Sequence, residues 1–185
     1  MPPMPPAPGL TVVQSSIHGY GVRAERRFAS GEQVIVGEGV TYDGDQDFDD
    51  TYALVLPAHD GAGHDDLAAP PIYYDLVDQT RWINHSCEPN TAIESAWDAA
   101  TGAIRAWWVA TRPIEPGEEL SYDYAFLGAL AEPCNCGAAT CRGLIVDLDP
   151  EEVAAIPGHL RHLLRLPPRG SAPGAAAGAA IAEHS

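Results

Sequence analysis

Three of the four cysteines in this 185-residue chain form one short cluster, Cys134-Asn135-Cys136 followed by Cys141. A disulfide between two cysteines only one residue apart would be badly strained, whereas two thiolates at that spacing can bind the same metal ion. A structural zinc ion takes four ligands in a tetrahedral arrangement, so the cluster supplies three of them. We therefore expect a zinc-binding loop near the C-terminal end, ordered by its metal.

The fourth zinc ligand is not fixed by this spacing. Cys87 is the remaining thiol of the chain, and His85 or the pair His159 and His162 are alternatives. If Cys87 is the ligand, the metal joins the segment after Asp78 to a much later loop. Structural zinc sites of this kind contribute ~10 kcal/mol or more to folding.

Short β-branched and aromatic runs between Gly, Pro and Asp residues predict a mainly β chain from Leu10 to about Asp147. One helical turn is predicted over Asp78–Asn84. A longer helix is predicted over Pro150–Leu166, with acidic residues at its start, basic residues at its end and an interruption at Pro157-Gly158. The predicted strands are Leu10–Gln14, Gln33–Val40, Thr51–Leu56, Thr91–Trp97 and Ala103–Thr111.

The two ends of the chain have biased compositions. Residues 1–9 are rich in proline and are expected to form an extended, unpacked leader. Residues 167–185 are rich in Ala, Gly, Pro and Ser and are expected to be disordered. No stretch approaches the roughly 18 apolar residues of a membrane span, and the N-terminal residues lack the features of a secretory signal. These patterns favour a cytoplasmic protein without a membrane partner.

The charge of the chain is strongly one-sided, with 26 acidic residues against 10 basic ones and a net charge of −16. All ten basic residues are arginines, so lysine is absent. Direct binding to nucleic acid is disfavoured, because neutralising phosphates requires a basic surface. A cationic partner is favoured instead.

The acidic residues gather in one stretch, because no basic residue occurs between Arg27 and Arg81 while ten aspartates do. The densest part runs from Asp43 to Asp66. This stretch can be a solvated loop that keeps the protein soluble. It can also be an acidic wall that steers a cationic substrate toward a cleft.

Three further segments carry residue types that are common in ligand-binding and catalytic sites. Gly19-Tyr20-Gly21 follows the first predicted strand and indicates a tight turn or a close approach of the backbone to a ligand. Arg81–Asn90 holds Asn, His and Ser beside Cys87. Gly117–Tyr124 holds Tyr122 and Tyr124, which are separated by one residue and therefore point to the same side of a predicted strand. A tyrosine pair is also typical of an aromatic stripe on an edge strand.

Taken in order, these segments and the cysteine cluster resemble the SET-domain protein lysine methyltransferases that carry a post-SET zinc-binding segment. The resemblance runs from about Leu10 to Ile145 and ends with Cys141-Arg142-Gly143-Leu144. Four motifs in the order of the family make it specific. The lysine-free composition, rich in alanine and arginine, hints at a compact, bacterial-type member.

The resemblance implies a mainly β fold made of short, β-clip-like sheets, in which the Asn84–Asn90 and Tyr122–Tyr124 regions form a pseudoknot. It implies a SET domain over residues 10–126, a post-SET zinc-binding loop over 130–146 and a short C-terminal helix over 150–166.

The resemblance also implies the residues of the site. Tyr124 and Tyr122 are the expected catalytic residues, and Tyr74 is expected near the substrate. One structural Zn²⁺ is expected on Cys87, Cys134, Cys136 and Cys141. The residues expected to bind S-adenosyl-L-methionine are Gly19, Tyr20, Gly21, Asn84, His85, Tyr124 and Leu144.

The implied reaction is methyl transfer from S-adenosylmethionine to the side-chain amine of a lysine in a protein. Tyr122 occupies a position that is Phe or Tyr in the family, and a tyrosine there implies mainly monomethylation with some dimethylation. A basic substrate, such as a histone-like or ribosomal protein, is expected, and a chain without lysine must act on another molecule. The alternatives are a zinc-stapled SET-like module that binds peptides without turnover, and methylation of a small amine or of a residue other than lysine.

Overall fold

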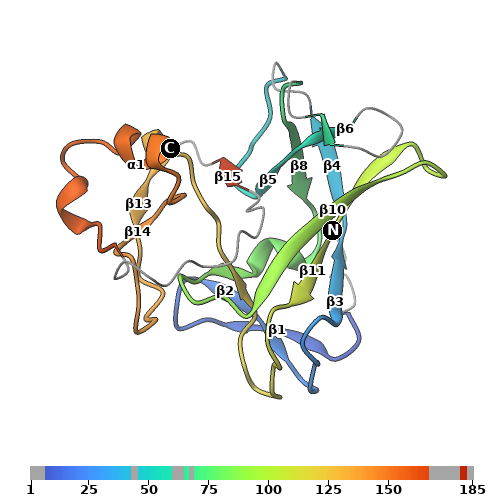
Figure 1. The fold of residues 1–185 in the computed structure, drawn as a ribbon. Helices are drawn as coiled ribbons and strands as arrows, with labels where there is room; N and C mark the ends of the chain where they lie inside the picture. The colour runs from blue at the N-terminus through green and yellow to red at the C-terminus, as the bar shows by residue number, and fades with distance from the viewer. Residues whose placement is uncertain (1–6, 43–45, 60–64, 67–68, 167–179, 183–185) are drawn as a thin grey trace.

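A hairpin opens the fold in this computed structural model, which describes residues 7–42, 46–59, 65–66, 69–166 and 180–182. β1 (Leu10–Gln14) pairs antiparallel with β2 (Tyr20–Ala24), drawn in blue in Figure 1. The turn between them contains Gly19, whose φ of +49° lies in the left-handed region that glycine adopts readily. Leu10 and Val22 are buried and anchor the hairpin on the main core.

The longest strands form a three-stranded antiparallel sheet in the order β10-β11-β3. β10 (Thr91–Asp98) and β11 (Ala103–Ala110) make a long hairpin, and β3 (Gln33–Gly37) pairs along the other side of β11 (Figure 1). Trp108 of β11 is fully buried and meets the ring of Tyr122 edge-on at 5.7 Å. This sheet therefore supports one of the two predicted catalytic tyrosines from behind.

A second sheet has the strand order β15-β5-β8-β4. Its strands are β4 (Gly39–Tyr42), β5 (Ala53–Leu56), β8 (Ile72–Leu76) and β15 (Ala180–Ala182). The strand predicted over residues 33–40 divides at Glu38, where the chain passes from the first sheet into the second. The short strands β6 (Ala58–His59) and β7 (Asp65–Asp66) pair with each other.

Tyr74 of β8, which is expected near the substrate, packs in the main core of the structure. Its side chain is buried, and its hydroxyl donates to the carbonyl oxygen of Gly37 at 3.0 Å. A Cβ at Gly39 would lie 2.4 Å from the Tyr74 ring, so glycine leaves room for the tyrosine. Alternation along β8 directs this side chain inward.

Two very short parallel strands bring distant motifs together. β9 (Asn84–His85) pairs with β12 (Ser121–Tyr122), with Asn84 opposite Ser121 and His85 opposite Tyr122. The turn before β9 is η1 (Gln79–Trp82), which begins at Asp78, whose carboxylate accepts from the backbone N–H of Thr80. The segments that the resemblance joins in a pseudoknot thus lie side by side.

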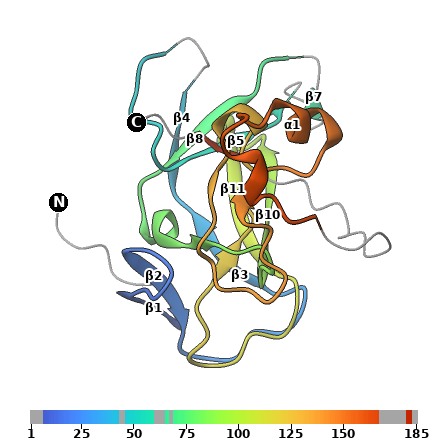
Figure 2. The same cartoon turned by 90° about the vertical axis from the view of Figure 1, so that its left-hand side faces the viewer.

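Residues 128–164 form a smaller C-terminal unit with its own core, orange in Figure 1 and in front of the sheets in Figure 2. Its buried side chains are Ala131, Leu144, Val146 and Ile156. Its elements are η2 (Gly128–Leu130), β13 (Glu132–Pro133), β14 (Leu144–Ile145), α1 (Pro150–Ala155) and η3 (Arg161–Leu163).

The mainly β fold class with short sheets and a short C-terminal helix is confirmed. The helix predicted over 150–166 is shorter in the structure, because α1 ends at Ala155, just before the Pro157-Gly158 interruption, and only the turn η3 follows. The predicted leader and tail lie mostly outside the described residues. Ala180–Ala182 of that tail form a strand rather than disorder, because the edge of β5 offers backbone partners.

No helix among the described residues is both long and apolar enough to cross a membrane. The acidic stretch is described only in part, since residues 43–45 and 60–64 lie outside the described ranges.

Candidate functional site

A cavity of about 420 Å³ lies where the β1–β2 turn, β9, the segment after β12 and the cysteine loop meet. This volume falls in the range of ligand-binding pockets. The cavity thus joins the motifs singled out in the sequence. The residues that line it are Ile17–Tyr20, Thr51, Tyr52, Leu76, Arg81, Trp82, Asn84, His85, Tyr122, Tyr124, Phe126, Glu132–Cys136 and Ile145.

Asn84 ties the β1–β2 turn to the rest of the site. Its side-chain amide nitrogen donates to the carbonyl oxygen of Tyr20 at 2.8 Å and to Oε1 of Glu119 at 2.9 Å. The side chain is buried, so these bonds fix its orientation. The amide of Asn84 therefore holds the backbone of the turn at the cavity wall.

Glu119 is a residue of this site that the sequence did not reveal. Both of its carboxylate oxygens accept from the hydroxyl of Ser15, at 2.8 and 3.0 Å, and one also accepts from Asn84. A Cβ at Gly21 would lie 2.4 Å from Glu119 Oε1. Gly21 thus lies against Glu119, behind the cavity wall, and glycine is needed there for space.

His85 is buried between the tyrosines and the cysteines. Burial lowers the pKa of His85 to about 4, so the imidazole is neutral at pH 7. Its Nδ1 accepts from the backbone N–H of Tyr124 at 3.2 Å. A neutral imidazole has one acceptor nitrogen, so Nε2 carries the proton and faces Cys87 Sγ at 3.4 Å.

Tyr124 and Tyr122 stand next to each other, with ring centroids 4.7 Å apart. The hydroxyl of Tyr124 donates to the carbonyl oxygen of Ile83 at 2.9 Å. Tyr122 is only 2% exposed, and burial raises its pKa well above the ordinary value. With Phe126, whose ring lies 5.7 Å from that of Tyr124, the two tyrosines give the cavity an aromatic wall.

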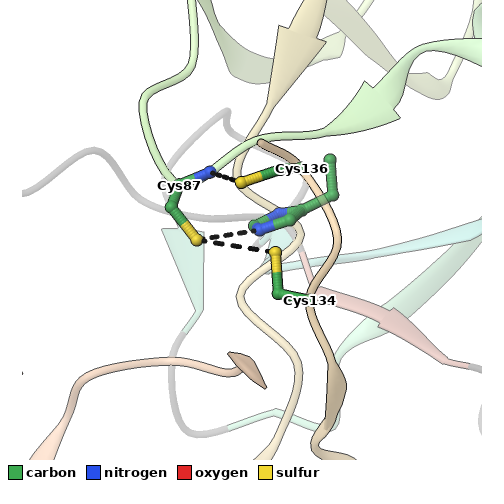
Figure 3. A group of neighbouring side chains, drawn as sticks. Cys87, Cys134 and Cys136 are labelled. Atoms are coloured by element: carbon green, nitrogen blue, oxygen red, sulfur yellow. Dashed lines mark hydrogen bonds between the residues drawn. The ribbon is translucent and has the colours of Figure 1, made fainter. Parts of the chain in front are cut away.

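Three of the four cysteines, Cys87, Cys134 and Cys136, come together at one point, as Figure 3 shows. Ligand atoms of Cys87, Cys134, Cys136 and His85 all lie within 4.8 Å of one another. Cys87 Sγ is 3.7 Å from Cys134 Sγ, and the backbone N–H of Cys87 donates to Cys136 Sγ at 3.5 Å. Cys141 is not part of this tight group, but its thiol interacts with the Cys136 sulfur. This donor set fits a zinc ion.

The cysteine loop favours the thiolate form of Cys136. Burial alone would raise its pKa, but hydrogen bonds from the backbone N–H groups of Cys87 and Ala138 lower it to about 7. The alternative ligands His159 and His162 are not in the group of metal-ligating side chains found among the described residues.

The structure places most of the expected cofactor-binding residues at the cavity: Gly19, Tyr20, Asn84, His85 and Tyr124. Leu144, which is also expected to bind the cofactor, does not line the cavity in this structure. Its side chain is 0% exposed in the C-terminal core, and its neighbour Ile145 lines the cavity instead, because successive residues of a strand face opposite sides.

Trp82 of η1 also lines the cavity. Its ring lies 6.0 Å from that of Tyr20.

Comparison with known proteins gives a family match. A family model described as "SET domain" matches residues 19–125, a range that begins at Gly19 and contains β2, Asn84-His85 and Tyr124.

Several similar proteins are named histone-lysine N-methyltransferases. The protein ash1 of Drosophila melanogaster is 34% identical over 146 residues, which are 75% of this chain and 6% of that protein. ASHH3 of Arabidopsis thaliana is 33% identical over 141 residues, 72% of this chain and 37% of that protein. Histone-lysine N-methyltransferase 2B of Homo sapiens is 36% identical over 145 residues, 71% of this chain and 5% of that protein. The chain therefore spans well under half the length of each of these relatives.

Proposed function

The chain belongs to the SET-domain family, and from that premise we propose that it transfers a methyl group from S-adenosylmethionine to the side-chain amine of a lysine in a protein. The observation that carries the proposal is the convergence of the β1–β2 turn, Asn84-His85 and Tyr124 on one cavity. Relatives named histone-lysine N-methyltransferases support it.

The cavity residues fit S-adenosylmethionine, which when bound supplies an electrophilic methyl group on a sulfonium. Tyr20, Trp82 and Ile145 offer apolar surface, and the backbone at Gly19 lies open because no side chain covers it. Asn84 and His85 add fixed polar groups to the lining of the same cavity. Such a mixture of apolar walls and a few fixed polar groups is typical of cofactor sites.

Only a neutral lysine amine has the lone pair that attacks the methyl carbon. Neutralising a lysine of pKa ~10.4 at pH 7 costs roughly 4.6 kcal/mol. The aromatic wall of Tyr122, Tyr124 and Phe126 lowers that cost, because removal from water disfavours the ammonium form.

No side chain at the cavity is needed as a general base. The carboxylate of Asp123 is paired with Arg142, and that of Glu119 is held by Ser15 and Asn84. We propose that the lysine proton passes to water before the methyl group moves.

The role of Tyr124 is alignment. Its hydroxyl donates to the carbonyl oxygen of Ile83, which fixes the hydroxyl group of a residue that lines the cavity. An acceptor beside an electron-poor methyl group can take weak C–H hydrogen bonds and keep that group in line for attack. Holding reactants in line removes several kcal/mol of entropic barrier.

We propose one structural zinc ion on the thiolates of Cys87, Cys134, Cys136 and Cys141. His85 lies as near as the thiols, but its Nδ1 accepts from Tyr124 and its Nε2 therefore carries a proton. With the proton on Nε2, His85 would donate to the sulfur of Cys87 rather than bind the ion, which favours Cys141 as the fourth ligand. The ion would hold residues Glu132–Cys136 against the cavity that they line.

The test is to incubate the purified chain with isotope-labelled S-adenosylmethionine and a cell extract, then to locate the label by peptide mass spectrometry. We expect labelled lysine, mainly monomethylated, in basic proteins, and little label with Tyr124→Phe. Because the chain contains no lysine, labelled lysine comes from a substrate.

Other outcomes separate the alternatives. Cofactor binding in calorimetry without label in any protein would favour a binding module without turnover. Label on a small amine or on another residue type would change the substrate class. No cofactor binding at all would end the proposal.

A further inference from the structure

Arg142 connects the cysteine loop to the segment that carries the tyrosines. It directly follows Cys141, and its side chain is 10% exposed. Both terminal nitrogens of its guanidinium donate to Asp123, each at 2.6 Å to a different carboxylate oxygen. Such a paired, bidentate contact fixes both position and direction. Asp123 in turn lies between Tyr122 and Tyr124 in the chain.

Asp123 supports an unusual turn directly after Tyr124. Ala125 has a φ of +47°, in the left-handed region that residues with a Cβ rarely adopt. Its backbone N–H donates to Asp123 Oδ1 at 3.1 Å. A conformation of this kind persists only where its surroundings hold it. The Asp123 carboxylate, fixed by Arg142, is such a support.

The backbone of Arg142 is fixed from two other directions. Its N–H donates to Cys87 Sγ at 3.4 Å, and its carbonyl oxygen accepts from the backbone N–H of Arg165 at 2.7 Å. The position of the guanidinium is therefore set by the cysteine loop and by the C-terminal unit, and not only by Asp123.

We propose that Arg142 is a positioning residue for methyl transfer, acting through Asp123 to hold the turn at Ala125 and with it the Tyr124 ring and hydroxyl. This inference rests on the proposed function. It assigns to the cysteine loop a second role besides lining the cavity, because the loop carries the guanidinium that aligns the catalytic segment.

The central test is Arg142→Met, which keeps an unbranched side chain of similar length and removes the pair. We expect kcat to fall by about 10- to 100-fold, as misplacement of an aligning group does. Zinc content and the Kd of the cofactor should stay within about threefold of the unmodified chain, since neither uses the guanidinium. Arg142→Lys keeps the charge but not the bidentate contact. Its kcat should lie between that of the unmodified chain and that of Arg142→Met.

The matched control is Arg161→Met. Arg161 also lies in the C-terminal unit, and its guanidinium donates to the backbone carbonyls of Ile156 and Ala154, away from the tyrosines. This variant should keep the full kcat. In an Asp123→Asn background, Arg142→Met should add little further loss, because the pair acts as one unit.

Amide hydrogen exchange tests the same geometry without any turnover. Exchange in a peptide spanning residues 121–127 should be several-fold faster in Arg142→Met than in Arg161→Met, because the Ala125 amide loses a fixed acceptor. If the unmodified chain transfers no methyl group, the proposed function fails while this measurement still decides whether Arg142 holds the turn.

Two results would overturn the inference. One is an unchanged kcat and unchanged exchange in Arg142→Met. The other is a loss of zinc or of cofactor affinity as large as the loss of kcat in both Arg142→Met and Arg142→Lys. That result would mean that Arg142 only stabilises the cysteine loop.

Discussion

At the scale of single residues, the space behind the β1–β2 turn is shared by Gly21 and Glu119. The glycine is needed because of what lies against it, since a Cβ there would meet the Glu119 carboxylate at 2.4 Å. That carboxylate cannot move without releasing Ser15 and Asn84. A change at Gly21 therefore reaches the cavity through Asn84.

Gly21→Ala should weaken cofactor binding by about tenfold, because displacement of Glu119 frees the Asn84 amide that it orients. Calorimetric titration with S-adenosylmethionine measures the change. Glu119→Ala should have a similar effect, and the double variant should be no worse than Glu119→Ala alone. Losses that simply add would show that Gly21 acts independently of Glu119.

Tyr122→Phe should change the number of methyl groups added. A tyrosine hydroxyl can anchor a water that fills the space needed for a second transfer, and losing a well-placed water is worth on the order of 1–2 kcal/mol. We expect the unmodified chain to stop mainly at monomethyl-lysine and the variant to proceed to di- and trimethyl-lysine. Intact-peptide mass spectrometry measures the products.

Tyr124→Phe is the matched control for this variant, and it should slow every step. Predominant trimethyl-lysine from the unmodified chain would contradict the role given to Tyr122.

The sequence predicted the residues whose chemistry is visible in a motif, such as Asn84, His85 and Tyr124. It missed residues whose role depends on neighbours from distant segments. Glu119 lies in a recognisable motif, but its partners Ser15 and Asn84 are far away in the chain. Ile145 rather than Leu144 lines the cavity because of the way the two-residue strand β14 faces. No periodic pattern in the sequence can fix the facing of so short a strand.

At the scale of elements, the strands predicted from the sequence exist, but β2 and β8, which are as long as β1, were missed together with the two-residue strands. The prediction for Leu10–Gln14 matches β1, and that for Thr91–Trp97 differs from β10 by one residue. β9 and β12 have only two residues each, and their parallel pairing brings the site together. Such pairing depends on the fold around it rather than on local β propensity.

The cysteine loop gives a prediction for metal removal. Cys87→Ser should reduce zinc below one ion per chain and weaken cofactor binding by about tenfold or more, because Glu132–Cys136 form part of the cavity wall and metal ligands tied to folding are costly to lose. Elemental analysis and calorimetry measure the two effects.

Cys141→Ser distinguishes the two candidates for the fourth ligand. With four thiolates, it should lower zinc content as much as Cys87→Ser does. Full zinc content in Cys141→Ser would instead identify His85 as the ligand, since its Nε2 already faces Cys87 at 3.4 Å.

The contact between η2 and α1 gives a stability prediction. A Cβ at Gly128 would lie 1.8 Å from the carbonyl oxygen of Glu152, so the helix rests directly on this glycine. Gly128→Ala should lower the free energy of unfolding by roughly 1–3 kcal/mol, as overpacking does. Denaturant unfolding measures it. Gly158→Ala, with open space around its added Cβ, is the matched control and should be neutral; equal stability of both variants would contradict the contact.

At the scale of the whole molecule, charge bears on the choice of substrate. The net charge of −16 attracts basic proteins from a distance, and salt screens that attraction over about 8 Å at physiological ionic strength. Asp47 and Asp50 lie just before Thr51 and Tyr52, which line the cavity, so the acidic stretch reaches the site itself. Local steering and attraction by the overall charge are thus separable.

With a basic peptide substrate, KM should rise several-fold as salt increases from about 0.05 M to about 0.3 M, while kcat changes little. Neutralising Asp47 and Asp50 together as asparagines should raise KM at low salt and flatten this dependence. Neutralising the exposed Glu25 and Glu151 as glutamines changes the net charge equally, outside the acidic stretch between Arg27 and Arg81, and should have a smaller effect. Equal effects of the two double variants would assign the attraction to overall charge, and a KM independent of salt would remove electrostatic steering altogether.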